Sequence, residues 1–88
     1  MALVIIPATL RDHCSGASKI EAPGATIGEV LRAVDARCPG LYARVVEGDR
    51  LRPELAFALN GEVIPLALHD RVNETTEIAI VPALGGGS

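Results

Sequence analysis

One amphipathic helix, set between strand-like segments, is the feature that most constrains the fold of this chain. Its apolar face is formed by Ile27, Val30, Leu31, Val34 and Cys38, which recur at helical spacing. Thr26 and Glu29 stand three residues apart at its start, as in a capping box. Pro39-Gly40 predicts its end. So short a helix is not stable alone in water, and it needs an apolar surface to pack against.

Short apolar or alternating segments predict the strands that supply this surface, at 2–6, 18–22, 55–59, 62–64 and 77–81. We expect 9–13 to continue the first strand, 41–47 to add a helical turn or two, and Asn60-Gly61 to form a hairpin turn. The order of these elements is neither a βαβ repeat nor all-β. It predicts an α+β domain, a mixed sheet with one main helix packed on one face.

Composition limits what such a domain can do. The chain has 88 residues, of which 49% are hydrophobic and 2% aromatic, and it therefore predicts one small domain with an aliphatic core and no deep cavity. The net charge is −3, and Lys19 is the only lysine, which argues against a nucleic-acid surface. No run approaches the roughly 20 apolar residues that span a membrane. No signal peptide is recognised, so we expect a cytoplasmic protein.

Cysteine and histidine are too few and too far apart to predict a metal or catalytic site. Cys14 and Cys38 lack metal-ligand spacing, and reduced, partly buried thiols are their expected state, with a disulfide left open. His13 and His69 are distant in sequence, and the neighbours His13 and Cys14 would point to opposite faces of a strand. We therefore predict no catalytic residue, no metal and no bound cofactor.

Several short motifs, in this order and spacing, resemble those of the ubiquitin-like β-grasp sulfur carriers. That family includes the molybdopterin synthase small subunit, the thiamin sulfur carrier and the sulfur carrier of cysteine biosynthesis. The motifs are Leu10-Arg11, the stretch 24–31 entering the helix, Pro39-Gly40-Leu41, the stretch 59–62 around the hairpin turn, and 80–84 running into the glycines. The stretch 48–52 resembles the cysteine-biosynthesis branch most. The family's usual Gly-Asp turn before the last strand is replaced here by Asn73-Glu74-Thr75-Thr76.

The resemblance implies a β-grasp domain over residues 1–82, with a sheet of four to five strands, and a glycine tail over 83–88. In the family a partner enzyme, an adenylyltransferase like the ubiquitin-activating enzymes, uses ATP to activate the terminal glycine carboxylate. Sulfur transfer then gives a thiocarboxylate, which a sulfur-acceptor enzyme consumes. The implied sulfur-carrying residues are Gly85, Gly86 and Gly87, and the carrier is a co-substrate and not an enzyme. The acceptor pathway is left open.

Ser88 departs from the family pattern, because it follows the glycine pair that the resemblance aligns at Gly86-Gly87. Three interpretations stay open: removal by a peptidase such as a metal-dependent one, a linker remnant, or a plain flexible end. An intact Ser88 would keep the Gly87 carbonyl in a peptide bond. A protein modifier joined to partner lysines through glycine is the main alternative function, followed by a non-covalent interaction domain.

A docking surface is expected because ordering a glycine tail inside a partner costs conformational entropy, about 1–2 kcal/mol per residue. If one face of the sheet carries the helix, alternation places a second set of apolar side chains on the other face. The predicted docking residues are Ala56, Ala58, Ala79, Val81, Leu84 and Arg11. Ordinary surface positions are the competing interpretation for each of them.

Overall fold

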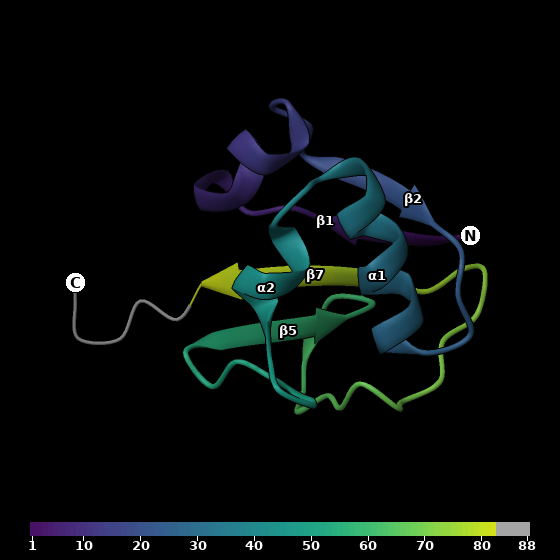
Figure 1. Cartoon of the computed structure of the whole chain (residues 1–88). Helices are drawn as coiled ribbons and strands as arrows, with labels where there is room; N and C mark the ends of the chain where they lie inside the picture. The colour runs from purple at the N-terminus through teal and green to yellow at the C-terminus, as the bar shows by residue number, and fades with distance from the viewer. Residues whose placement is uncertain (83–88) are drawn as a thin grey trace.

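A mixed five-stranded sheet, with helices across one face, organises residues 1–82, which are the residues that the computed structural model describes (Figure 1). In chain order the elements are β1 (Ala2–Ile5), the 3-10 helix η1 (Ala8–Cys14), β2 (Lys19–Ala22), α1 (Ile27–Arg37), α2 (Leu41–Val45), β3 (Val46–Glu47), β4 (Arg50–Leu51), β5 (Leu55–Leu59), β6 (Glu62–Val63) and β7 (Glu77–Pro82). The strand order is β2-β1-β7-β5-β6, and β3 and β4 form a separate small sheet. Only the β1–β7 pair is parallel in the large sheet, so the predicted mixed sheet with one main helix is confirmed.

The core lies between this sheet and α1. Ile27, Val30, Leu31 and Val34 of the predicted helical face are fully buried, and they pack with the inward side chains of the central strands. Those inward side chains include Val4, Phe57, Ile78 and Ile80. The core is aliphatic apart from Phe57 and the two cysteines, Cys14 and Cys38, and its scarcity of aromatic residues is as the composition predicts.

The predicted start of α1 is confirmed at Thr26, and the long segment before β7 supports it. Thr26 Oγ1 accepts a hydrogen bond from Glu29 N at 3.2 Å. Glu29 Oε1 accepts from Ala25 N at 2.9 Å, one residue earlier than in an ideal capping box. The free amides of the first turn are satisfied by the 65–72 segment, because Ile27 N donates to Asp70 O and Gly28 N to Leu68 O, each at 2.9 Å.

Two turns lie beside the N-terminal end of β7. Asn60 and Gly61 both have positive φ, 53° and 87°, which is the backbone of a tight hairpin turn and confirms that prediction. Before β7, Asn73 Oδ1 accepts from Thr75 N at 2.9 Å and from Thr76 Oγ1 at 3.1 Å. The Asn-Glu-Thr-Thr sequence therefore makes its turn without the family's Gly-Asp pair.

Two expectations for the N-terminal third are wrong. Residues 9–13 do not continue the first strand; they lie in η1, because the chain leaves the sheet at Pro7, which has no N–H to donate to the ladder. The cysteines are not reduced thiols: Cys14, the last residue of η1, forms a disulfide with Cys38 at the C-terminal cap of α1. The change from strand to helix is what brings Cys14 to the helix end.

Candidate functional site

The C-terminal end of β7 is the place from which the predicted tail departs. β7 is the middle strand of the sheet, parallel to β1 and antiparallel to β5, and Pro82 at its end lies opposite Leu55. The predicted sulfur-carrying residues Gly85, Gly86 and Gly87 follow it, as do Leu84 and Ser88; all of these lie outside the described residues. The described fold thus delivers the chain to the tail from its most central strand.

Four of the predicted docking residues come together on the sheet face that does not carry α1. Ala56 pairs with Val81, and Ala58 pairs with Ala79, in adjacent strands. Their strand neighbours Phe57, Ile78 and Ile80 are buried in the core, so alternation turns this set outward. Val81 is 38% exposed, whereas Ala58 is only 7% exposed between its neighbouring strands. Their role in docking stays a prediction.

This outer face is larger than the sequence pattern indicates. Val63 of β6 lies opposite Ala58 and is 66% exposed, and Ile5 of β1 lies opposite Ala79. Leu3, two residues before Ile5, extends the same row of side chains and is partly exposed. The signal was present, since Ala2–Ile6 is apolar at every position, which predicts a strand with two apolar faces. Which face lies toward the helix becomes clear only from the pairing with β7.

Arg11 belongs to η1 and not to a strand end. Its Nε donates to Ile6 O at 3.1 Å, and the side chain is partly buried. Because β1 runs parallel to β7, the chain leaving β1 at Ile6 is at the same end of the sheet as Pro82. Arg11 is therefore placed at the tail end of the molecule, although its guanidinium is partly engaged by the backbone.

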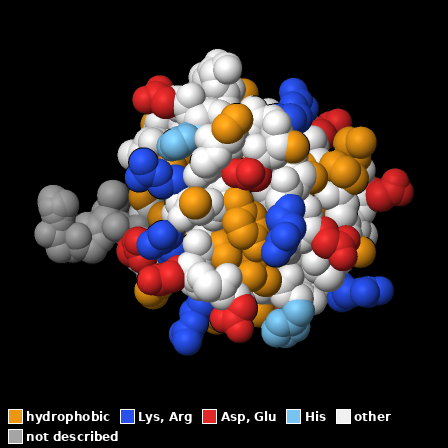
Figure 2. All heavy atoms as spheres, in the orientation of Figure 1, with side chains coloured by type: hydrophobic (Ala, Val, Ile, Leu, Met, Phe, Trp, Pro, Cys, Tyr) orange, Lys and Arg blue, Asp and Glu red, His pale blue; other side chains and the backbone are white. Residues whose placement is uncertain are grey.

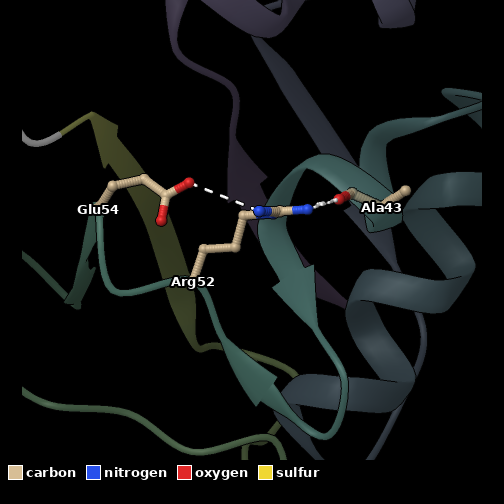
Figure 3. Close-up of polar contacts among 3 residues, drawn as sticks. All are labelled: Ala43, Arg52 and Glu54. Atoms are coloured by element: carbon tan, nitrogen blue, oxygen red, sulfur yellow. Dashed lines mark hydrogen bonds and ion pairs between the residues drawn. The ribbon is translucent and has the colours of Figure 1, made fainter.

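A second arginine, Arg52, joins the segment before β5 to α2. Arg52 donates to Ala43 O of α2 through Nε at 3.2 Å and Nη2 at 3.0 Å, and its Nη1 lies 3.6 Å from Glu54 Oε2 (Figure 3). Glu54 directly precedes Leu55, the partner of Pro82. The sequence gives no hint of this bridge, because it joins a loop to a helix carbonyl nine residues away.

The surface of the described residues has shallow hollows and no cluster of side chains that could hold a metal ion. An apolar hollow of about 390 Å³ runs along β5 between Pro53 and Pro65, and another of about 420 Å³ lies at the opposite end near Met1 and Pro23. No three His, Cys, Asp or Glu side chains within residues 1–82 are close enough to hold a metal ion. On the helix-bearing face, acidic and basic side chains are interspersed around a central apolar strip and do not form a basic stripe (Figure 2).

A comparison with models of protein families identifies the family of this chain. A model described as the ThiS family matches residues 4–87, from β1 through the glycine pair. The chain belongs to the ThiS family. The predicted resemblance to ubiquitin-like sulfur carriers is thereby confirmed, and the match ends at Gly87, one residue before Ser88.

Relatives of this ThiS-family chain are small carrier and modifier proteins of similar length. "Small archaeal modifier protein 3" of Haloferax volcanii is 31% identical over 65 residues, covering 72% of this chain and 71% of that protein. A chain of the Amycolatopsis orientalis BexX/CysO complex superposes with a TM-score of 0.89 at 32% identity, covering 99% of this chain and 100% of that one. Mycobacterium tuberculosis CysO gives a TM-score of 0.84 at 25% identity, with 94% and 99% covered.

These relatives confirm the ubiquitin-like β-grasp fold and support a role as a sulfur carrier or modifier. The relatives of the ThiS-family chain are small carrier and modifier proteins. None of the helices in the described part is long and apolar enough to cross a membrane.

Proposed function

We propose that this protein is a sulfur carrier whose Gly87 carboxylate is adenylated by a partner enzyme and converted to a thiocarboxylate. The observation that carries the proposal is the extent of the family match, which runs from β1 to the glycine pair and stops at Gly87. Glycines suit such an end because, without a Cβ, they can pass through a narrow channel and adopt any φ. Catalytic groups and the ATP site would belong to the partner, and the carrier would bind no cofactor of its own.

The outer face of the sheet supports this proposal as the surface that meets the adenylating enzyme. It is apolar, it borders the end of β7, and its exposed members include Val81 and Val63. The A. orientalis relative was crystallised in a BexX/CysO complex, so a protein of this shape does associate with a protein partner. After activation, a sulfur-acceptor enzyme would bind the same tail with sulfur attached at Gly87.

The resemblance of the 48–52 stretch to the cysteine-biosynthesis branch favours that type of carrier. Ser88 must then be removed by a peptidase, of which a metal-dependent enzyme is one type, because a peptide-bonded Gly87 has no carboxylate to adenylate. Since activation consumes ATP, we place this step in the cytoplasm.

The test compares two forms of the chain, one ending at Gly87 and one ending at Ser88, with ATP, a sulfide source and a ubiquitin-activating-like adenylyltransferase. Intact-mass measurement should show one oxygen replaced by one sulfur in the shorter form and no change in the longer form. A known carrier in the same mixture controls for enzyme activity. If that control is converted and the Gly87 form is not, the proposal is wrong.

A role as protein modifier is the second candidate, favoured by the H. volcanii relative named as a modifier protein. It would use the same activated glycine but transfer it to amines of other proteins. Larger conjugates that contain the Gly87 form would support this function. Absence of both the thiocarboxylate and the conjugates would favour a non-covalent interaction domain.

A further inference from the structure

Lys19 is the only lysine of the chain, and the sheet places it on the same outer row as the strand that leads to the tail. Lys19 of β2 lies opposite Ile5 of β1, and Ile5 lies opposite Ala79 of β7. All three side chains point to the face without the helix, because the alternate positions Ile20, Val4 and Ile78 are buried in the core. The lysine and the tail-bearing strand are thus separated by a single strand.

The lysine side chain is free to react. It is exposed, and β2 is an edge strand of the sheet, so nothing within residues 1–82 covers its outer side. Among the described residues the one ion pair joins Arg52 and Glu54, and no hydrogen bond involves the Lys19 side chain. An amine in this position is open to an electrophile from outside or from the same chain.

The distance that the tail must cover is within its reach. Two strand spacings and three residues along β7 separate the Cα atoms of Lys19 and Pro82, which gives about 14 Å from sheet geometry. Five residues, from 83 to 87, can span up to about 16–18 Å when extended. The lysine side chain adds its own length, so the acyl carbon of Gly87 can meet Lys19 Nζ without any change in the fold.

The other amine of the chain is placed less favourably. β1 runs parallel to β7, and Leu3 lies opposite Glu77, so Met1 is at the end of the sheet opposite to Pro82. About seven residues of strand, or roughly 23 Å, separate the two levels, which exceeds the span of the five-residue segment. The fold therefore selects Lys19 over the N-terminal amine.

We propose that Lys19 is an intramolecular acceptor for the activated C-terminal glycine, an inference that rests on the proposed adenylation. The neutral Nζ amine attacks the carbonyl carbon of the Gly87 adenylate, a C–N bond forms, the bond to AMP breaks, and the amine releases a proton to solvent. The product is a closed chain with an isopeptide bond between Gly87 and Lys19. Because both groups belong to one molecule, the reaction benefits from a high effective concentration.

The closed form would be a dead end for sulfur transfer. Sulfide and Lys19 compete for the same acyl carbon, so closure should dominate when the sulfur source is scarce. Lys19 would then be a modification site, and its reaction would remove carrier molecules from sulfur transfer when sulfide is scarce.

The test uses the chain ending at Gly87 with ATP and the adenylating enzyme, and withholds the sulfur source. We expect a species lighter by one water, with fragments that map the isopeptide to Lys19. The first-order rate constant of its formation should not depend on carrier concentration. Lys19→Arg should abolish it. The double variant K19R/E74K is the matched control, because it moves the single lysine to the exposed turn before β7, at the far end of the sheet, and should not close.

The same three chains, prepared as C-terminal thioesters, separate this inference from the proposed function. If the wild-type thioester closes, the inference holds even where the enzyme is inactive. If sulfide yields the thiocarboxylate but neither route yields closure, the carrier function stands and the role of Lys19 is wrong. Water loss that persists in Lys19→Arg, attachment at Met1, or products of two chains would also overturn it.

Discussion

Cys14 and Cys38 form a disulfide that ties the end of η1 to the C-terminal cap of α1. Their Cα atoms are 4.4 Å apart, and both side chains are buried. The other side-chain attachments of η1 among the described residues are two hydrogen bonds, from Arg11 Nε to Ile6 O and from His13 Nδ1 to Pro39 O. The disulfide is therefore the covalent link between this segment, which stands at the tail end of the sheet, and the end of α1.

Removal of this disulfide should lower the free energy of unfolding by about 3 kcal/mol, because it closes a loop with a sequence separation of 24 residues. Urea denaturation of the oxidised protein, with and without a dithiol reductant, measures the change. The variant C14A/C38A should resemble the reduced wild type and should not respond to the reductant. An unchanged midpoint on reduction of the wild type would contradict the prediction.

The stability of the reduced form also matters for the proposed location of the protein in the cytoplasm. Disulfides are rare in the reducing cytoplasm, so a cytoplasmic carrier has to retain its fold with both thiols free. The aliphatic core between the sheet and α1 does not include η1 beyond Cys14 and the packing of Leu10, which makes this possible.

Asn60 should be sensitive to substitution for two separate reasons. Its φ of 53° is unfavourable for residues with a branched or bulky side chain, and its Oδ1 accepts from Glu77 N at 2.8 Å. We expect Asn60→Ala to cost about 1–2 kcal/mol of stability, since it loses the bond and keeps the backbone penalty. Asn60→Asp keeps the acceptor, Asn60→Gly relieves only the backbone, and thermal unfolding should rank Ala as the least stable of the three.

The sequence predicts most of this fold, because its local signals are strong. The capping pair Thr26 and Glu29 fixes the start of α1, and Asn60-Gly61 fixes the tight turn between β5 and β6. The η1 helix was missed, since Leu10 and Cys14 suit a strand by composition, and the departure at Pro7 depends on how β1 pairs with β2 and β7. The Arg52 bridge was missed because a backbone carbonyl acceptor leaves no trace in the sequence.

The site divides in the same way. Alternation in β5 and β7 predicts the outer face, whereas its extension to Ile5 and the place of Lys19 follow from the parallel β1–β7 pairing, which no local pattern specifies. Long-range register of this kind is set by the whole core.

Gly24 should tolerate no side chain. Its φ is +150°, and a Cβ there would lie 2.7 Å from Val30 N and 2.9 Å from Glu29 Cβ, at the first turn of α1. We expect Gly24→Ala to cost more than about 2 kcal/mol, because both contacts are with the helix itself and cannot yield. Gly16→Ala is the matched control: its φ is +85°, but nothing lies within 4 Å of the added Cβ. Equal unfolding midpoints for the two variants would show that the close contact does not matter.

Val81 and Val63 allow a test of where on the outer face the adenylating enzyme docks. Both are exposed valines on this face, at 38% and 66%, but Val81 directly precedes Pro82 and Val63 lies on the short edge strand β6. Because binding energy concentrates in the central, desolvated part of an interface, Val81→Asp in the Gly87-terminated chain should raise the KM for activation about tenfold, or about 1.4 kcal/mol. Val63→Asp should raise the KM for activation much less.

Both variants should keep the unfolding midpoint near that of the wild type, since neither valine belongs to the core cluster. A KM unchanged by Val81→Asp would remove the outer face next to the tail from the docking surface, whereas equal increases for both valines would show that the partner covers the whole face from β7 to β6.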